Sequence, residues 1–541
     1  MKHVIMGDGG KAQGSISVFM TLIFGVILAV VTATFENVRF VTVDSYMMAA
    51  AEAAAMSVFG EYNQELYQEY GLFGYGGYEG HGVTELSKAF LDSVSYNLAT
   101  RPEADDSSDI IQQRMDYTSL YRIGNVSNEL SDIESLTNAT VFYQQVEAYL
   151  KTQVIDDITE EIAGIYHNIT KQGEQETIQQ DLNTTSEYEH GNYEMPDEVG
   201  KDIEKDKDAA KDTGSSTTAE QAAGNPLETF RELLRDGVLN LVCDADQLSE
   251  ETIEAAYTQP KQETVSSNKI GNSTADLLKD LLKDDEGIMA DSFLDTTKEK
   301  GELICYAQQV LSQYTHRKEK TFQYGIEYLI SGSAQERDNL LNVISRLFVI
   351  RTAINYAYVH ADASLQAASL ATATEIAGAL GVPPLISAIQ QTILIILSAE
   401  ESCVDITALL EGKMVPIFKD ATNFQMKYAE ICGVSKAMFQ KKAKKYSAGK
   451  GKWSAGSLNY QQYLWIFMLL VPEQQLRLRT CDLIQNDLQK RCNPTFSLEQ
   501  CISGMRYQIG YDMPFLWSGL LPGGQENGII SKQTSGWYRY Q

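Results

Sequence analysis

The stretch that decides the fold is QGSISVFMTLIFGVILAVVTATFENVR, residues 13–39, which lies near the N-terminus and is almost entirely apolar. From Ser15 to Phe35 it carries no charged side chain and is rich in Ile, Val, Leu and Phe. In a helix, about 20 residues at 1.5 Å each extend about 30 Å, the thickness of the hydrocarbon core of a bilayer. We therefore predict a transmembrane helix over residues 15–36, preceded by a leader at residues 1–14.

The charged residues on either side of this segment predict its orientation. Lys2 and Lys11 precede it with one acidic residue between them, whereas Glu36 and Asp44 follow it with one arginine between them. Positively charged flanks stay in the cytoplasm. We expect a single-pass protein of the cell membrane, with a cytoplasmic N-terminal leader and an extracytoplasmic C-terminal domain.

A cleaved secretory signal is the alternative interpretation of the same segment. The apolar region of such a signal has about 7–15 residues and ends at a small-x-small cleavage site. The run in this chain is longer, although TATFE at residues 32–36 can serve as a cleavage site. The sequence favours a retained anchor in the bilayer and leaves the cleaved signal open.

The residues after the apolar run favour a helix that leaves the membrane as a stalk. The sequence DSYMMAAAEAAAMSVFGEYNQELYQEYG, residues 44–71, is dense in Ala, Met, Glu and Gln, which are good helix formers. We predict one continuous helix from Ile16 to Tyr70, with residues 37–70 as the stalk and Gly60 as its weakest point.

A stripe of small side chains, Ala49, Ala53 and Ser57, follows the stalk at helical spacing. Small residues allow a second backbone to approach closely. The stripe packs either on the globular part of the same chain or on helices of other copies or partners. The spacing favours the first and leaves the second open.

The charge balance restricts the class of partner. The chain has 541 residues, of which 73 are Asp or Glu and 44 are Lys or Arg, so its formal net charge is -29. Such a surface repels phosphate backbones, and we expect no nucleic-acid partner.

The seven cysteines form no CxxC pair, and their low density excludes a small disulfide-stapled scaffold. We expect scattered buried thiols. One pair among Cys481, Cys492 and Cys501 stays open in an exported domain.

The rest of the chain divides into three segments. Gly-rich turns, a strand pattern and amphipathic helices over residues 71–167 predict the first, α+β part of the extracytoplasmic domain. Residues 168–225 are highly charged and poor in apolar side chains, which predicts a disordered acidic linker. Residues 226–541 predict the mainly helical remainder. The predicted fold class is therefore α+β, predominantly helical, with a small β component behind one long N-terminal helix.

Individual elements are expected at particular places in these segments. Helices are predicted over residues 84–98 and 140–166, a strand over residues 116–123, two helices separated at Pro472, and strands and turns over residues 510–541. Residues 376–399 are uncharged, and a buried core helix is favoured there over a second membrane span.

No motif for a reaction, metal or cofactor occurs in the sequence. The six histidines show no HExxH or HxH spacing, and neither a GxSxG nucleophile elbow nor a phosphate-binding P-loop is found. We therefore predict a non-enzymatic protein without catalytic, cofactor-binding or metal-ligating residues. An enzyme with an unfamiliar site would require a deep pocket with converging acids or histidines.

Acidic residues beside apolar runs have an ordinary structural explanation. Glu327, Glu400 and Glu401 are predicted to be buried and paired with a cation, such as Arg351 or Lys413.

A lysine cluster lies in the stretch KKAKKYSAGKGK, residues 441–452, of this otherwise acidic chain. Lys441, Lys442, Lys444 and Lys445 are the candidate contact residues for anionic lipid, wall polymer or an acidic partner. A solvated loop face is the alternative.

The N-terminus resembles that of a type IV pilin or pseudopilin. The leader MKHVIMGDGGKAQG ends in glycine and precedes a long apolar helix that becomes amphipathic. The resemblance, which is to the looser starts of TadE/TadG-like pseudopilins, implies a leader-peptidase site between Gly14 and Ser15. The fifth mature position, usually Glu in this fingerprint, is Phe19.

Several longer segments resemble an uncharacterised family of Gram-positive anaerobes that has one N-terminal span and occurs alongside Tad/Flp pilus genes. They are AEAAAMSVFGEYNQELYQEYGLFGY, QYGIEYLISGSAQERDNL, IRTAINYAYVHAD, AEESCVDITALLEGKMVPIFK and LNYQQYLWIFMLLVPEQQLRLRTCDLIQNDLQ. The resemblance implies a pseudopilin-like structural or accessory component of a Tad/Flp pilus or related secretion system. Its partners would be the lipid bilayer and pilin-like or secretion-system proteins, and no small-molecule ligand can be named. A surface-anchored protein that binds cell-wall polymer or an external ligand is the alternative.

Overall fold

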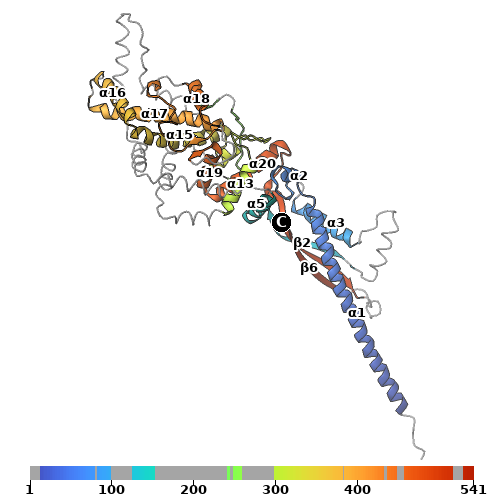
Figure 1. The fold of residues 1–541 in the computed structure, drawn as a ribbon. Helices are drawn as coiled ribbons and strands as arrows, with labels where there is room; N and C mark the ends of the chain where they lie inside the picture. The colour runs from blue at the N-terminus through green and yellow to red at the C-terminus, as the bar shows by residue number, and fades with distance from the viewer. Residues whose placement is uncertain are drawn as a thin grey trace, which may run out of the picture. The chain divides into compact units, whose positions relative to one another are not determined.

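The fold is described from a computed structural model (Figure 1). The described residues are 12–78, 82–98, 123, 125–152, 241–243, 248–258, 298–379, 381, 383–431, 435–447, 456–515 and 528–540. The predicted acidic linker at residues 168–225 lies outside them. The chain forms two compact units, here called unit 1 (Met1–Gln145 with Cys492–Gln541) and unit 2 (Val146–Arg491). Most of the structure is helical with a small sheet, which confirms the predicted fold class.

Helix α1, Ala12–Phe59, begins unit 1 and has two halves of different character. Every side chain from Ile16 to Val31 is exposed, although most of them are large and apolar. Within the described residues, α1 is the helix that is long and apolar enough to cross a membrane. A helix that is apolar all round and uncovered by protein suits a lipid environment, as in a membrane span or a signal sequence.

The second half of α1 is amphipathic and forms part of the core of unit 1. Val43, Met47 and Ala54 are among its buried side chains, whereas Ala49 and Ala53 are exposed. The predicted stripe of small residues therefore lies on the face that does not pack on the chain's own sheet. The expectation that the stripe packs on the same chain is wrong, because the neighbouring alanines occupy that position.

The predicted continuous helix to Tyr70 is also wrong, because α1 ends at Phe59. A separate helix, α2, spans Gln64–Tyr70. The side chain of Asn63 accepts a hydrogen bond of 2.9 Å from the backbone N–H of Leu66 and so caps the start of α2. The stalk is interrupted after Gly60, which the sequence identified as its weakest point.

The sheet of unit 1 joins strands from both ends of the chain. Its strands are β1 (Tyr75–Gly76), β2 (Val126–Ser135), β5 (Cys501–Pro514) and β6 (Ile529–Arg539). The long strand β5 is central, and β1, β2 and β6 all pair with it in antiparallel orientation. In Figure 1 β2 and β6 lie beside the later part of α1, while its apolar half extends beyond them.

One face of this sheet is covered and the other is open. Tyr507, Ile509 and Met513 of β5 alternate toward the core that α1 and α3 (Val83–Asn97) complete. The intervening positions of β5 are less buried and include Arg506 and Gln508. This alternation is typical of an antiparallel sheet with one solvated face. The predicted helix over residues 84–98 is confirmed, and so are the strands predicted over residues 510–541 where they are described, since residues 516–527 and 541 lie outside the described part.

The predicted linear division of the chain differs from this arrangement. Residues 492–541 were assigned to the helical remainder, but their strands belong with the N-terminal segment in unit 1. Strand β2 was not predicted, and the strand predicted over residues 116–123 lies outside the described part except for Ile123. The helix predicted over residues 140–166 is α5, which is described over Ala139–Thr152.

Unit 2 is almost entirely helical. Its helices are α13 (Lys298–Val310), α14 (Gly325–Ser331), α15 (Glu336–Ala361), α16 (Ala363–Ala379), α17 (Ile386–Leu410), α18 (Lys436–Ala443), α19 (Tyr460–Leu470) and α20 (Glu473–Arg491). Short strands β3 (Val415–Pro416) and β4 (Ser457–Leu458) pair with each other. The chain breaks at Pro472, between α19 and α20, as predicted.

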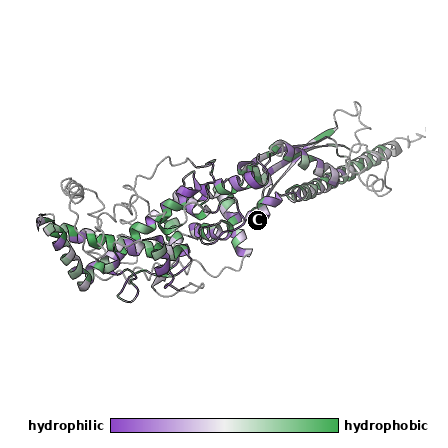
Figure 2. Cartoon of the chain, turned by 90° about the horizontal axis from the view of Figure 1, so that it is seen from above, coloured by the Kyte–Doolittle hydropathy of each residue, from purple (hydrophilic) through white to green (hydrophobic). Residues whose placement is uncertain are grey.

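Helix α17 is the centre of unit 2 and packs along α15 and α16. Its Ile393, Leu397 and Val404 are completely buried. The later part of the uncharged stretch at residues 376–399 lies in this core helix, as predicted, whereas its first part ends α16 and turns through Pro383–Leu385. Figure 2 shows hydrophobic positions along the helices of this unit. Five of the six cysteines in the described residues are buried, which agrees with the prediction of buried thiols.

Candidate functional site

The most distinctive polar feature of unit 2 is an ion pair buried between α15 and α17. Arg351 of α15 and Asp405 of α17 both have side chains that are 0% exposed. Arg351 donates to Asp405 Oδ2 from Nε at 3.0 Å and from Nη2 at 2.6 Å. Two charges removed from water are stable only when all their hydrogen-bonding groups are satisfied, so the neighbouring residues matter.

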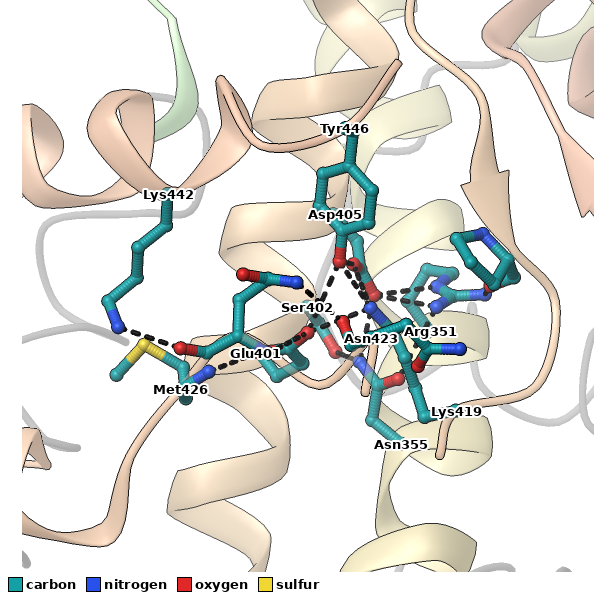
Figure 3. A network of polar contacts seen from close by, with 12 residues as sticks. Arg351, Asn355, Glu401, Ser402, Asp405, Lys419, Asn423, Met426, Lys442 and Tyr446 are labelled. Atoms are coloured by element: carbon teal, nitrogen blue, oxygen red, sulfur yellow. Dashed lines mark hydrogen bonds and ion pairs between the residues drawn. The ribbon is translucent and has the colours of Figure 1, made fainter. Parts of the chain in front are cut away.

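The chain after α17 supplies the remaining partners of these two charges. Arg351 Nη1 donates to the backbone oxygens of Pro416 and Ile417, both at 2.9 Å. Lys419 Nζ donates at 2.7 Å to Asp405 Oδ1 and at 2.7 Å to Glu401 Oε1 (Figure 3). The helix pair is thereby fastened to the loop that follows it.

Neutral side chains and backbone amides complete the arrangement. Tyr446 donates its hydroxyl to Asp405 Oδ1 at 2.8 Å, and Asn355 Nδ2 donates to Asp405 Oδ2 at 3.0 Å. Glu401 accepts the backbone N–H of Met426 at 2.8 Å (Figure 3). We call this set the buried charge cluster. Its members are Arg351, Asn355, Glu401, Asp405, Lys419 and Tyr446.

The electrostatics of the buried charge cluster are balanced, with two cations and two carboxylates. Burial opposes the ionisation of Asp405, but Arg351 and Lys419 hold its pKa below the usual range. Burial raises the pKa of Glu401 against the pull of Lys419, and it raises the pKa of Tyr446 well above the usual range. Tyr446 is therefore a neutral donor, and Asp405 remains charged at neutral pH.

The polar atoms of the cluster are engaged with one another and with the backbone. Among the described residues, none of its side-chain nitrogens or oxygens lacks a hydrogen-bond partner. A group whose bonding capacity is already used inside the protein is suited to positioning. We therefore interpret the cluster as an ionic link between α15, α17 and the loop around Lys419, and not as an acid–base site.

Residues 216–513 match a family of unknown function, DUF5702. The chain belongs to this family. The matched residues include the whole buried charge cluster of this chain and end within β5, whereas α1 precedes them. No curated protein and no solved structure matches the chain. The expected membership of an uncharacterised family is confirmed.

Outside the cluster, two predicted acids of this DUF5702 chain are buried without a cation bonded to them. Glu327 accepts the hydroxyl of Tyr460 at 2.8 Å and the backbone N–H of Tyr314 at 3.0 Å, and burial raises its pKa to about 7. Neither carboxylate oxygen of Glu400 has a hydrogen-bond partner among the described residues, and burial raises its pKa to about 9. Their predicted ionic pairing is wrong, because neither carboxylate forms an ion pair with a cation among the described residues.

The predicted partners of Glu401 were also wrong. Arg351 pairs with Asp405, and Lys413 contacts Glu411 and the backbone oxygen of Ala443. Sequence reasoning missed Asp405, although it lies four residues after Glu401 on one helix. Residues at this spacing share a helix face. Two acids on the same buried face require more than one cation to balance their charge.

The lysine cluster does not form one surface. Lys441, Lys444 and Lys445 are exposed at the end of α18. Lys442 is buried, forms an ion pair with Glu430, and donates to the backbone oxygen of Gln425 at 2.8 Å. Lys442 is therefore a structural residue and is removed from the predicted contact set.

The other predicted site residues lie on α1. Gly14 and Ser15 are both helical and fall near the start of α1. Cleavage between them stays a prediction. Within the described residues, no group of three or more His, Cys, Asp or Glu side chains is arranged to hold a metal ion.

A polar hollow of about 520 Å³ lies on unit 2. Its lining includes Ser249, Glu250, Glu251, Thr252 and Lys490. Lys490 and Glu251, which both line the hollow, form an ion pair with each other at 2.6 Å. Their charges are therefore already balanced within the protein.

Proposed function

We propose that the protein is a membrane-anchored extracytoplasmic structural or accessory protein, and a pseudopilin-like component of a Tad/Flp pilus or related secretion system. It is non-enzymatic, with a cytoplasmic N-terminus and a single membrane span. One observation carries the proposal. Helix α1 runs unbroken from an exposed apolar half into a half that forms the core of unit 1.

The continuity of α1 supports a retained anchor over a cleaved signal. The alternative cleavage site at residues 32–36 lies inside the helix. Glu36, the last residue of that stretch, and Arg39 are buried and form an ion pair at 2.9 Å. A cut at this site would remove the helical turns that lead into a buried contact of unit 1. The apolar half of α1 and the half that packs in unit 1 are therefore better interpreted as one continuous helix.

The pseudopilin-like part of the proposal is supported by the resemblance of the N-terminus and by the exposed face of α1. Ala49 and Ala53 lie on this face, and so does Met56. Small side chains on an uncovered helix face permit close approach of a second helix. The role we assign to this face is packing against pilin-like helices.

The anchor is tested by N-terminal sequencing of the protein extracted from membranes. A start at Met1 or Ser15 supports the proposal, and Ser15 adds pilin-type processing after Gly14. A start near Glu36, or recovery of the protein in the soluble fraction without detergent, refutes the anchor. Protease protection in intact cells tests the orientation, because an extracytoplasmic domain must be digested from outside.

The packing role is tested by enlarging one small residue on the exposed face. Ala53→Leu is expected to reduce co-isolation of pilin-like proteins severalfold while the thermal melting curve stays unchanged. The matched control is Tyr96→Leu, because Tyr96 is exposed on α3 and 70% accessible. Equal co-isolation by both variants would show that the stripe is not the contact.

A surface-anchored binding protein for wall polymer is the second candidate, favoured by the three exposed lysines at the end of α18. Reversing the charge of Lys441, Lys444 and Lys445 to Glu should then reduce sedimentation with purified cell wall severalfold. Lys427→Glu, at another exposed lysine, is the control. Unchanged sedimentation would exclude this surface.

A further inference from the structure

One end of the sheet in unit 1 is fastened to α1 directly after its apolar half. Arg39 Nη2 donates to the backbone oxygen of Pro514, the last residue of β5. The rings of Phe40 and Phe515 meet edge to face at 5.6 Å between centroids, and Lys532 Nζ lies 5.5 Å from the Phe40 ring. These contacts fix the β5–β6 end at the level of residues 39–40.

Strand register shows which residues reach furthest toward the apolar half of α1. Ile529 pairs with Pro514, whereas Lys532 pairs with Tyr511. The hydroxyl of Tyr511 donates to Asp44 at 2.7 Å, one helical turn further from the apolar half than Phe40. Ile529 therefore lies at the end of the sheet closest to the membrane span, and its side chain is 49% exposed.

The rise of the helix gives the distance of this sheet end from the hydrocarbon core of a bilayer. If the hydrocarbon layer ends at Phe35, Arg39 follows by four residues, or about 6 Å at 1.5 Å per residue. Each headgroup layer adds about 5–7 Å beyond the hydrocarbon core. The end of the sheet, fastened at Arg39, falls within that layer.

Exposed apolar side chains lie at this level on both α1 and β6. Val38 of α1 is 60% exposed, and Ile529 of β6 is 49% exposed. Among the charged groups nearby, Arg39 pairs with Glu36, and Lys532 lies over the ring of Phe40. The exposed apolar side chains at this level are suited to the boundary between the hydrocarbon core and the headgroups.

We propose that the β5–β6 end of the sheet is a second membrane contact, in which Ile529 of β6 and Val38 of α1 insert into the headgroup layer of a phospholipid bilayer. This proposal rests on the proposed anchor, because α1 sets the depth. A helix alone can tilt and rotate in a bilayer. A rigid sheet end seated beside it restricts both motions and fixes the height of unit 1 above the lipid.

The test measures the depth of nitroxide labels on the full chain in phosphatidylcholine nanodiscs. Cys432 and Cys492 are first replaced by Ala, and single cysteines are introduced at Leu28, Ile529 or Trp537. Leu28 lies in the span, and Trp537 is 51% exposed on the same strand as Ile529. It is eight residues further along, or about 26 Å at 3.3 Å per residue.

Electron paramagnetic resonance compares collisions of each label with oxygen and with a water-soluble nickel complex. We expect the oxygen-to-nickel ratio at residue 529 to exceed that at residue 537 severalfold and to lie below that at residue 28. A label at Gln533, exposed on the same strand, should give an intermediate ratio and serves if the variant at 529 does not fold.

The outcomes separate this contact from the anchor. A lipid-like ratio at residue 28 with equal aqueous ratios at residues 529, 533 and 537 overturns the second contact and leaves the anchor intact. An aqueous ratio at residue 28 overturns the anchor, and the second contact with it. A graded decrease from residue 529 to residue 537 supports both.

Discussion

Neutralising Asp405 should destabilise unit 2 more than any other single change to the buried charge cluster. Asp405 accepts hydrogen bonds from Arg351 and Lys419 at 2.6 to 3.0 Å and from Asn355 and Tyr446 at 2.8 to 3.0 Å. Asp405→Asn keeps the size of the side chain and removes its charge. Two buried cations are then left to share the single carboxylate of Glu401.

The magnitude follows from the cost of a buried charge without its counterion. Removing one member of a buried pair costs about 3–5 kcal/mol, because the remaining charge is desolvated and uncompensated. We expect Asp405→Asn to lower the free energy of opening of α15 and α17 by this amount. The exposed Asp338→Asn, on α15, is the control and should change it by less than about 0.5 kcal/mol.

A double variant tests whether charge balance is the cause. Asp405→Asn with Arg351→Met leaves Lys419 and Glu401 as one neutral pair. The double variant should therefore be more stable than the sum of the two single losses predicts, with a coupling of about 1–3 kcal/mol. Additive losses would mean that Arg351 and Asp405 do not compensate one another.

The assay is native-state hydrogen exchange of the full chain in detergent, read by mass spectrometry on peptides from α15 and α17. Exchange reports local opening, so it does not require the two units to unfold together. A loss below about 1 kcal/mol for Asp405→Asn would refute the reasoning, since an uncompensated buried cation cannot be that inexpensive.

Two further changes have expected outcomes from the structure. Burial raises the pKa of Glu400 from 4.5 to about 9, so its contribution to stability is fully present below pH 4.5 and is lost as the pH rises toward 9. Glu400→Gln should therefore make the urea concentration at the unfolding midpoint less dependent on pH between pH 5.5 and 8.5. An unchanged pH dependence of that midpoint would contradict the raised pKa. Gly332 has φ +74, and an added Cβ would lie 2.5 Å from the guanidinium of Arg479. Gly412 has a similar φ of +75 but open space around it, so it is the control for backbone conformation. Gly332→Ala should lower the melting temperature more than Gly412→Ala, because only the first substitution also creates a steric clash. Equal decreases would show that the positive φ alone causes the loss of stability.

The sequence was sufficient where a local pattern carried the structure. The uncharged run from Ser15 to Phe35 predicted the apolar half of α1, and Pro472 predicted the break between α19 and α20. It was insufficient for β2, whose sequence VSNELSDIES contains several residues that disfavour strands. That strand pairs with β5 more than 350 residues further along the chain, for example Asn128 with Ile509. Such pairing has no local signal.

The candidate site shows the same limit. Burial of Glu401 was predicted from the apolar residues around it, and the helical spacing places Asp405 on the same face. The identity of the cations depends on how the loop after α17 folds back, which brings Lys419 onto both acids. Glu400, the residue next to Glu401, is buried and forms no ion pair or hydrogen bond through its carboxylate in the part of the chain that the structure describes. Adjacent side chains on a helix point about 100° apart, so one of these two neighbouring acids is paired with a lysine and, within the described residues, the other is not.

The order of the chain has a consequence for how unit 1 forms. Its core needs the face of α1 that carries Val43 and Met47, and this face is covered by β5 and β6 near the C-terminus. Unit 2 lies between these segments in the sequence, so all of it is made before unit 1 can close. Until then the buried face of α1 lacks its cover. If α1 is the membrane anchor proposed above, the bilayer holds the helix meanwhile. The anchor then serves folding as well as attachment, because it keeps the first segment of unit 1 available for the last.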